Sequence, residues 1–273
     1  MILVDTHVHI HRCFNLDLFL SSSARNFRSA AEKVCPQQSY RAVLWLAEDS
    51  VTSEFDRLRQ FADRHSNRDS WSISRTHEPH SLIASHQTLG SLTILAGRQI
   101  RCDEGIEILG LGTNRLFEDG IALHAAIEQI HADGAIAVLP WGFGKWTGRR
   151  GRVVRQLMES LTPEEISLGD NSGRLAFWLE PAEFSLARRR GFRILPGSDP
   201  LPFASEVSRA ASYGLAVAGE LSDTDPAGDM LTLLSDPAIR ITPFGRLEGP
   251  VRFLRNQLAM QWVKRRRSER HHS

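Results

Sequence analysis

The sequence predicts an α/β protein, most simply a distorted TIM-like barrel of seven or eight β/α units. Two observations favour this fold class. Short apolar runs typical of buried strands alternate with longer amphipathic stretches typical of helices, strictly so after residue 119. Polar residues collect directly after the apolar runs, where the active face of such a barrel lies. A β-rich insertion around residues 82–112 interrupts the alternation.

The first half of the chain contains most of the expected strands. Ile2 to Ile10 is interpreted as a buried strand at the N-terminus, and residues 41–47 as a second one. Between them, residues 15–34 carry apolar side chains at helical spacing, and Pro36 stops that helix. Residues 71–74 alternate like a strand, and three strand-like runs separated by turn residues fill the insertion.

In the second half, helices and strands are expected in turn. The expected strands cover residues 135–139, 165–168 and 192–195, each after an amphipathic helix. Residues 205–214 and 229–234 are interpreted as helical. A final amphipathic helix from Pro250 to about Arg267 is expected to bury its apolar side. That side consists of Val251, Leu254, Leu258 and Trp262.

Composition describes an ordinary globular chain of 273 residues, 41% hydrophobic and 24% charged. The length fits a single domain over residues 1–263, followed by a basic tail over residues 264–273. No apolar run approaches the roughly 20 residues of a membrane span, and the N-terminus lacks the basic start of a signal peptide. Three scattered cysteines without a Cys-x-x-Cys pair favour a reducing, cytoplasmic compartment.

Charge is distributed unevenly along the chain. The formal net charge is +1, but residues 250–273 contain seven lysines and arginines against one glutamate. Such a tail can bind phosphate-rich partners, although most basic tails are solvated helix ends. Because the remainder of the chain has a negative balance, nucleic acid is not the expected partner.

The N-terminal strand carries three side chains suited to a metal. Asp5, His7 and His9 share one face of the strand, because strand side chains alternate. Two imidazoles and a carboxylate fit one or two divalent ions such as Zn, Mn or Fe, with Asp5 as a ligand or as the residue that orients one. The alternative is that these histidines only hydrogen-bond to the backbone.

Acidic and histidine side chains follow most of the other expected strands. A single acid at such a position is usually a helix cap or turn residue, but their placement on one rim favours an active site. These residues are Glu48, Asp49, His77, Asp170, Asn171 and Asp199.

The loop over residues 141–151 combines four glycines, two tryptophans and three cations. Lys145, Arg149 and Arg150 fit a phosphorylated or carboxylated small molecule, and Trp141 could stack on a ring of that substrate. The alternative is a surface turn with charges at the start of a helix.

Three short motifs resemble the polymerase and histidinol phosphatase (PHP) family. They are His7-x-His9, the segment Gly105-Ile-Glu-Ile-Leu-Gly-Leu-Gly112 and the late Gly197-Ser198-Asp199. The opening Asp5-Thr-His-Val-His also resembles amidohydrolase-type barrels. The resemblance covers residues 2–215 and implies a seven-stranded (β/α) barrel, up to three metal ions and phosphoesterase activity.

The chain departs from the PHP pattern at several ligand positions. Glu48-Asp49 stands where the family has Asp-His, and Arg98-Gln99 stands at the end of the Gly-x-Glu motif. Glu107 replaces a histidine, Leu139-Pro140-Trp141 replaces Ala-His-Pro, and Leu201 replaces the closing histidine. One or two ions are therefore expected in place of three. The expected ligands are His7, His9 and Asp199, with Glu48 or His77.

These features lead to the hypothesis of a metal-dependent hydrolase that acts on an anionic small molecule. Asp199 is the expected ligand or general base, and Glu48 is a second catalytic candidate. The alternative is a non-catalytic barrel with a degenerate metal site that serves as a binding or scaffold protein.

Overall fold

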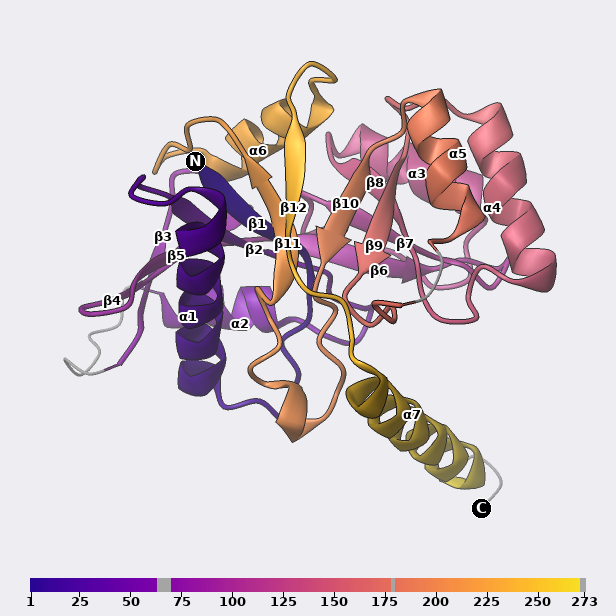
Figure 1. Ribbon diagram of the computed structural model, residues 1–273, viewed down its shortest axis with the longest axis horizontal. Coiled ribbons are helices and arrows are strands. Elements are labelled where there is room, and N and C mark those ends of the chain that lie inside the picture. The colour runs from indigo at the N-terminus through magenta and orange to yellow at the C-terminus, as the bar shows by residue number, and fades with distance from the viewer. Residues whose placement is uncertain (63–69, 178–179, 271–273) are drawn as a thin grey trace.

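The computed structural model describes residues 1–62, 70–177 and 180–270, with side chains up to residue 260. Two β-sheets face each other in it, and helices cover their outer sides (Figure 1). In the described part of the chain, none of the helices combines the length and apolar character that crossing a bilayer requires.

The larger sheet has seven strands in the order β12-β11-β1-β2-β5-β4-β3. β1, β2 and β5 run parallel, whereas the other neighbours pair antiparallel. The strands are β1 (Ile2–Val8), β2 (Arg41–Leu46), β3 (Ser72–Arg75), β4 (Ser81–His86), β5 (Gly90–Leu95), β11 (Tyr213–Val217) and β12 (Ile241–Gly245).

The smaller sheet has five strands in the order β10-β9-β8-β7-β6. β8, β9 and β10 are parallel, and β6 and β7 form an antiparallel hairpin at the other edge. The strands are β6 (Gly97–Arg101), β7 (Glu107–Leu111), β8 (Ile136–Pro140), β9 (Ser167–Asn171) and β10 (Ile194–Gly197).

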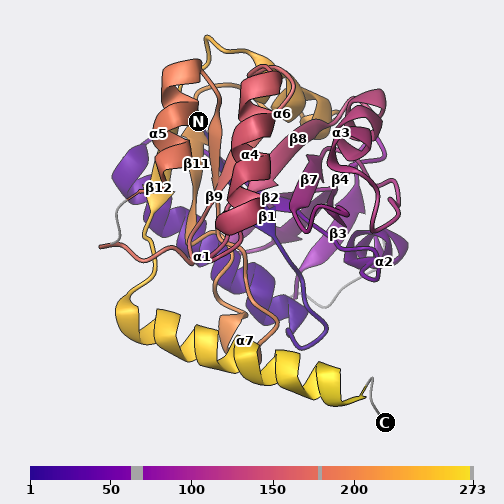
Figure 2. The same cartoon turned by 90° about the vertical axis from the view of Figure 1, so that its right-hand side faces the viewer.

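Helices form the outer layers. On the larger sheet lie α1 (Leu16–Val34), which begins at the cap residue Asn15, and the short α2 (Glu54–Phe61). On the smaller sheet lie α3 (Leu123–Ala132), α4 (Gly148–Ser160) and α5 (Ala182–Arg190), which Figure 2 shows together on one side. α6 (Pro226–Ser235) covers the end where β1 begins, and α7 (Pro250–Arg270) runs along the opposite end of the molecule (Figures 1 and 2).

The two sheets touch at two places and enclose an apolar interior. At the first, β1 lies against β10, and Thr6 Oγ1 donates to the Pro196 carbonyl at 2.9 Å. At the second, the Glu48 amide donates to the Gly97 carbonyl at 3.0 Å. The space between the sheets is filled by side chains such as Val4, Trp45 and Leu109. Both contacts lie at strand ends, so polar side chains of the two sheets meet there.

The predicted TIM-like barrel is wrong. Most of the expected strands and helices are present, but the strands form two mixed sheets and no closed barrel among the described residues. The reason is that β11 runs antiparallel beside β1, where a barrel would need a parallel neighbour. The segment 82–112 is likewise not an insertion, because β5 and the β6–β7 hairpin are integral parts of the two sheets.

Two helix assignments also need correction. Residues 205–214 were expected to be helical but contain the end of a 3-10 turn, Ala204–Glu206, and the start of β11. α7 forms as expected, yet its apolar side is not buried: Val251 is 84% exposed, Leu254 60% and Leu258 63%. The side chain of Trp262 and the tail over residues 264–273 lie outside the described side chains.

Candidate metal centre

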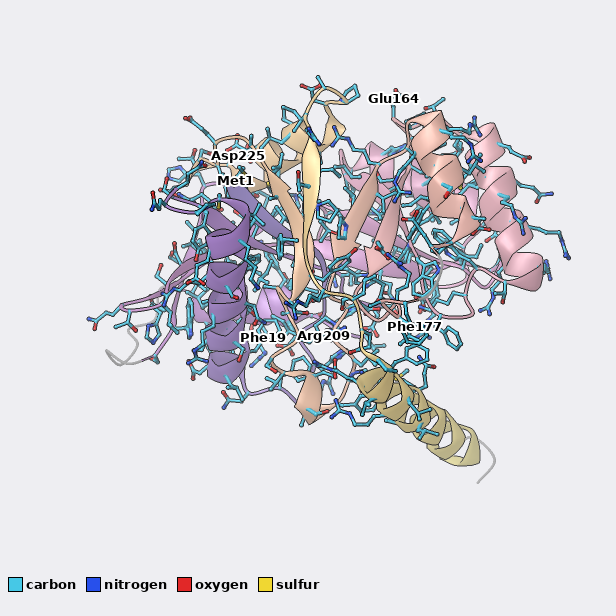
Figure 3. All side chains as sticks on the ribbon, in the orientation of Figure 1. Met1, Phe19, Glu164, Phe177, Arg209 and Asp225 are labelled. Carbon is cyan, nitrogen blue, oxygen red and sulfur yellow. The ribbon has the colours of Figure 1, made fainter. Side chains whose placement is uncertain are left out.

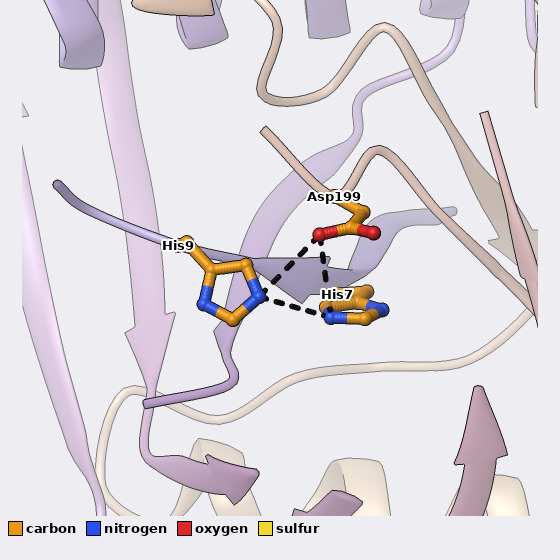
Figure 4. A group of neighbouring side chains, drawn as sticks. All are labelled: His7, His9 and Asp199. Atoms are coloured by element: carbon orange, nitrogen blue, oxygen red, sulfur yellow. Dashed lines mark hydrogen bonds and ion pairs between the residues drawn. The ribbon is translucent and has the colours of Figure 1, made fainter. Parts of the chain in front are cut away.

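Three of the predicted ligands meet at the junction of β1 and β10 (Figure 4). His7 Nε2 lies 3.1 Å from His9 Nε2 and 3.6 Å from Asp199 Oδ1, and His9 Nε2 lies 3.4 Å from the same oxygen. His7 is buried, while the side chains of His9 and Asp199 are 15% and 20% exposed. The group is therefore largely buried, and solvent reaches it at His9 and Asp199.

The backbone brings these side chains together across the seam between the sheets. Gly197 packs so closely on β1 that a Cβ there would lie 2.4 Å from His7 Cβ, so only glycine fits. Two residues on, the Asp199 amide donates to the His7 carbonyl at 2.8 Å. Asp199 has a φ of +47°, in the left-handed region that Asp tolerates better than most residues. This turn aims its carboxylate back at the two imidazoles.

Asp5 supports the junction and is not one of the converging ligands. It is fully buried and accepts from the amides of Ser198 at 2.8 Å and Ala211 at 2.7 Å, and from the Ser198 hydroxyl at 2.5 Å. Burial raises the pKa of Asp5 to about 6, against the lowering effect of these hydrogen bonds. Asp5 thus fixes the turn that presents Asp199.

Asn171 and His11 hold the ligands in place. Asn171 Nδ2 donates to Asp199 Oδ2, which leaves Oδ1 facing the histidines. The His11 ring stacks on His9 with centroids 5.5 Å apart, and its Nε2 bonds the Pro200 carbonyl at 2.8 Å. Asn171 was expected to bind substrate, whereas here it contacts a ligand. His11 was missed, although it continues the alternation of His7 and His9.

The local electrostatics favour the protonation states that a cation needs. Burial lowers the pKa of His7 to about 4, so this imidazole is neutral near pH 7. Burial would raise the pKa of Asp199, but His7 and His9 hold it well below its usual range. Neutral imidazole and ionised carboxylate are the forms that ligate divalent metals.

The spacing of the three atoms matches one metal ion. Zinc–ligand bonds of about 2.0–2.2 Å place two ligands of a tetrahedral ion about 3.4 Å apart. The observed separations of 3.1, 3.4 and 3.6 Å bracket this value. Three protein ligands around a tetrahedral ion also leave a fourth position for water or substrate.

Lys145 is a cation beside this group. It forms an ion pair with Glu107, the residue at the position where the PHP pattern has a histidine. The charge of Lys145 contributes to the lowered pKa values of both His7 and Asp199, so it acts on the site. Its side chain is 44% exposed and can reach a ligand from solvent.

Glu48 has a different environment. Its carboxylate accepts from the Phe55 amide at 2.9 Å and lies 3.3 Å from the guanidinium of Arg98, with both side chains buried. Burial raises the pKa of Glu48 to about 7, and the Phe55 hydrogen bond and Arg98 oppose that shift. Neighbouring Asp49 caps a turn by accepting from Thr52. The structure does not bring Glu48 into the group of three.

The other predicted site residues lie apart from the triad of His7, His9 and Asp199. His77 is exposed after β3, four strands from β1, which corresponds to about 19 Å of sheet. Asp170 points to the other side of β9, where it pairs with Arg174 at 2.8 Å and lines a cavity of about 520 Å³.

In the 141–151 loop, Lys145 is the residue whose charge lowers the pKa values of His7 and Asp199. Trp141 is buried in the core under α3–α5. Arg149 and Arg150 lie in the first turn of α4, where Arg149 is exposed and Arg150 donates to the Gly144 carbonyl at 2.8 Å.

Comparison with known proteins shows the fold and no family. No family model matches the chain, and no curated protein matches it in sequence. The matches to solved structures therefore place the chain in a class of α/β folds and in no particular family.

Two solved structures share the fold. PsfC from Pseudomonas syringae PB-5123 has a TM-score of 0.53 at 14% identity, over 96% of this chain and 98% of PsfC. The lesion-specific endonuclease PfuEndoQ from Pyrococcus furiosus has a TM-score of 0.51 at 8% identity, over 88% of this chain but 57% of the endonuclease.

Proposed function

We propose that this chain is a metal-dependent hydrolase of a phosphorylated or otherwise anionic small molecule. The observation that carries the proposal is the triad of His7, His9 and Asp199, whose ligand atoms have the spacing of one tetrahedral ion. The fold shared with PfuEndoQ, an endonuclease, supports hydrolysis, as does the resemblance of the same residues to the PHP motifs.

The side chains of the triad have separate roles in the proposed hydrolysis. A bound divalent ion supplies a water of lowered pKa and polarises the bond to be broken. His7 and His9 offer imidazole nitrogens, and Asp199 offers Oδ1 while Asn171 holds Oδ2. The carboxylate of Asp199 can also accept the proton of a water beside it, which makes it the general-base candidate.

Lys145 is the substrate-binding group that we assign to this site. An ammonium beside a metal triad attracts an oxyanion on the substrate and neutralises charge that develops during hydrolysis. The ion pair with Glu107 places Lys145 but leaves it partly exposed, so an incoming phosphate or carboxylate can share it. Arg149, exposed one turn further on, is the candidate for a second and weaker contact.

The experiment measures hydrolysis of phosphomonoesters and phosphodiesters of p-nitrophenol by the full chain loaded with zinc or manganese. We expect turnover that chelator removes and metal restores. Lys145→Ala should lower kcat/KM ten- to a hundredfold, because a charge-assisted hydrogen bond is worth about 1.5–3 kcal/mol. Arg149→Ala, which removes the same charge from the same loop, should cost less.

Two outcomes would oppose the proposal. A chain that binds one metal ion per molecule but hydrolyses none of these esters would favour the binding or scaffold alternative. Equal losses in Lys145→Ala and Arg149→Ala would show that the loop acts by general charge and that Lys145 has no specific contact.

A further inference from the structure

A second cavity is lined by none of the three triad residues and contains its own charged side chains. It has a volume of about 480 Å³, within the range of small-molecule sites. One wall is the second half of α1, the opposite wall is the chain from Phe244 to Arg252, and Arg209 lies at its inner end. Figure 3 shows Arg209 below β11 and β12, between α1 and the start of α7. We call it the α1–β12 cavity.

The charges that line this cavity are predominantly positive. Among the described residues that line it, four carry a positive charge and one, Glu248, carries a carboxylate. Glu248 is already bound on two sides: Arg209 makes two contacts of 3.1 Å with it, and Arg252 lies 3.5 Å away. Arg252 is further paired with Glu206 at 2.9 Å. Glu248 is therefore paired with Arg209 and Arg252. It does not pair with the other two cations, Lys33 and Arg246.

Lys33, on α1, and Arg246, just after β12, are the exposed cations that line the cavity, and we call their side of it the mouth. Both are exposed, and neither makes an ion pair or side-chain hydrogen bond with a described residue. Two cations gathered at one opening repel each other unless an anion lies between them. The mouth therefore has unused positive charge directed at whatever enters the cavity.

The interior supplies a hydrogen-bonding group and an apolar surface. The Ser212 hydroxyl is buried and has no hydrogen-bond partner among the described residues, and Ser212 lines the cavity. A buried hydroxyl without a partner costs free energy that a ligand oxygen could recover. Beside it lie the buried side chains of Ala30, Ala211 and Phe244, which suit the non-polar body of a small organic molecule.

We propose that the α1–β12 cavity binds a small phosphate-bearing molecule, with its phosphate between Lys33 and Arg246. The guanidinium fork of Arg246 matches two phosphate oxygens, and the ammonium of Lys33 supplies a second charge. The site is independent of the metal-dependent hydrolysis proposed above, because none of its lining residues belongs to the triad or its supports except Ala211, whose backbone amide bonds Asp5.

The test uses pyrophosphate as the probe and isothermal calorimetry on the full chain. We expect binding in the parent that weakens at least tenfold in Lys33→Ala and in Arg246→Ala, and is lost in the double variant. Arg25→Ala with Arg101→Ala is the matched control, since it removes the same charge from exposed positions that do not line the cavity. The control should bind pyrophosphate as the parent does.

A further arm separates the cavity from the triad. Binding should persist in His7→Ala with His9→Ala, and in Lys145→Ala, because neither change touches the cavity. Loss in these variants would place the anion at the metal centre and overturn the proposal. Absence of binding in the parent at millimolar pyrophosphate would also overturn it, as would equal weakening in the surface control. Thermal melting of each variant checks that it remains folded.

Discussion

Two strand ends that look alike in the sequence differ sharply in their electrostatic surroundings. After β10, Asp199 faces the imidazoles of His7 and His9 and is 20% exposed. After β2, Glu48 faces the guanidinium of Arg98, and both side chains are buried. The first carboxylate has an oxygen directed at two imidazole nitrogens, whereas the second is already paired with a permanent cation.

The difference shows what separates a ligand from a structural acid in this fold. Arg98 also donates to the carbonyl of Thr52 at 3.0 Å and to the side chain of Asn114 at 2.7 Å, so the Glu48 cluster satisfies its own groups. At the triad, in contrast, two nitrogens and one oxygen converge without a permanent cation at their centre. An acid at a strand end is thus available to a metal only where no arginine has neutralised it.

Removal of Arg98 should produce the largest loss of stability. Arg98→Ala leaves Glu48 and two oxygen acceptors without their donor, and breaking a buried ion pair costs about 3 kcal/mol or more. The loss, measured by urea unfolding, should be greater at pH 8 than at pH 5, because Glu48 can protonate at the lower pH. The matched variant Arg101→Ala, on an exposed strand end, should change stability by less than about 0.5 kcal/mol. A small and pH-independent loss in Arg98→Ala would show that the pair is not structural.

Glu48 should make stability depend on pH. Its pKa is about 7 in the folded chain against 4.5 in the unfolded one, so the folded state binds the proton more tightly. The contribution is therefore fully present below pH 4.5 and is lost as the pH rises through 7, by up to about 3 kcal/mol. Glu48→Gln should remove this part of the profile. Unfolding free energies measured from pH 4.5 to 8 check it, and parallel profiles for parent and variant would contradict it.

Asn171 should affect the metal affinity of the triad, although it is not one of the three ligands. Its amide holds Asp199 Oδ2, and loss of such a supporting hydrogen bond commonly lowers metal affinity 10- to 100-fold. Asn171→Ala should therefore bind zinc more weakly, as measured by competition with a chromogenic chelator, and should remain folded. Unchanged affinity would mean that the backbone turn alone positions Asp199.

The ligands of the triad could be predicted from the sequence, and their supports only in part. His7 and His9 follow from the alternation of one strand, and Asp199 from its position after a short apolar run. Lys145 was predicted as a cation, but its pairing with Glu107 was not, because the two residues are 38 positions apart. The buried ion pair of Glu48 was not predicted for the same reason, because its partner Arg98 lies 50 positions away.

The strands were easier to predict than their arrangement. Short apolar runs mark β1, β2 and β8, but direction and pairing depend on contacts between distant segments. Only the first two residues of β11 fell within an expected element, the helix over residues 205–214, and no strand was expected at Tyr213–Val217. Because β11 pairs antiparallel with β1, the strands form two sheets and not the expected barrel. The apolar side of α7 likewise predicted burial, although no described segment covers it.

The most direct test of the central claim is the metal content of the full chain purified without chelator. We expect one divalent ion per molecule in the parent, in Glu48→Gln and in His77→Ala, and none in His7→Ala with His9→Ala. Circular dichroism should show that the double variant keeps its fold, since His9 is on the open side and His7 packs at the end of β1. A parent without metal, or loss of metal in Glu48→Gln with retention in the double histidine variant, would contradict the assignment of the triad as the metal centre.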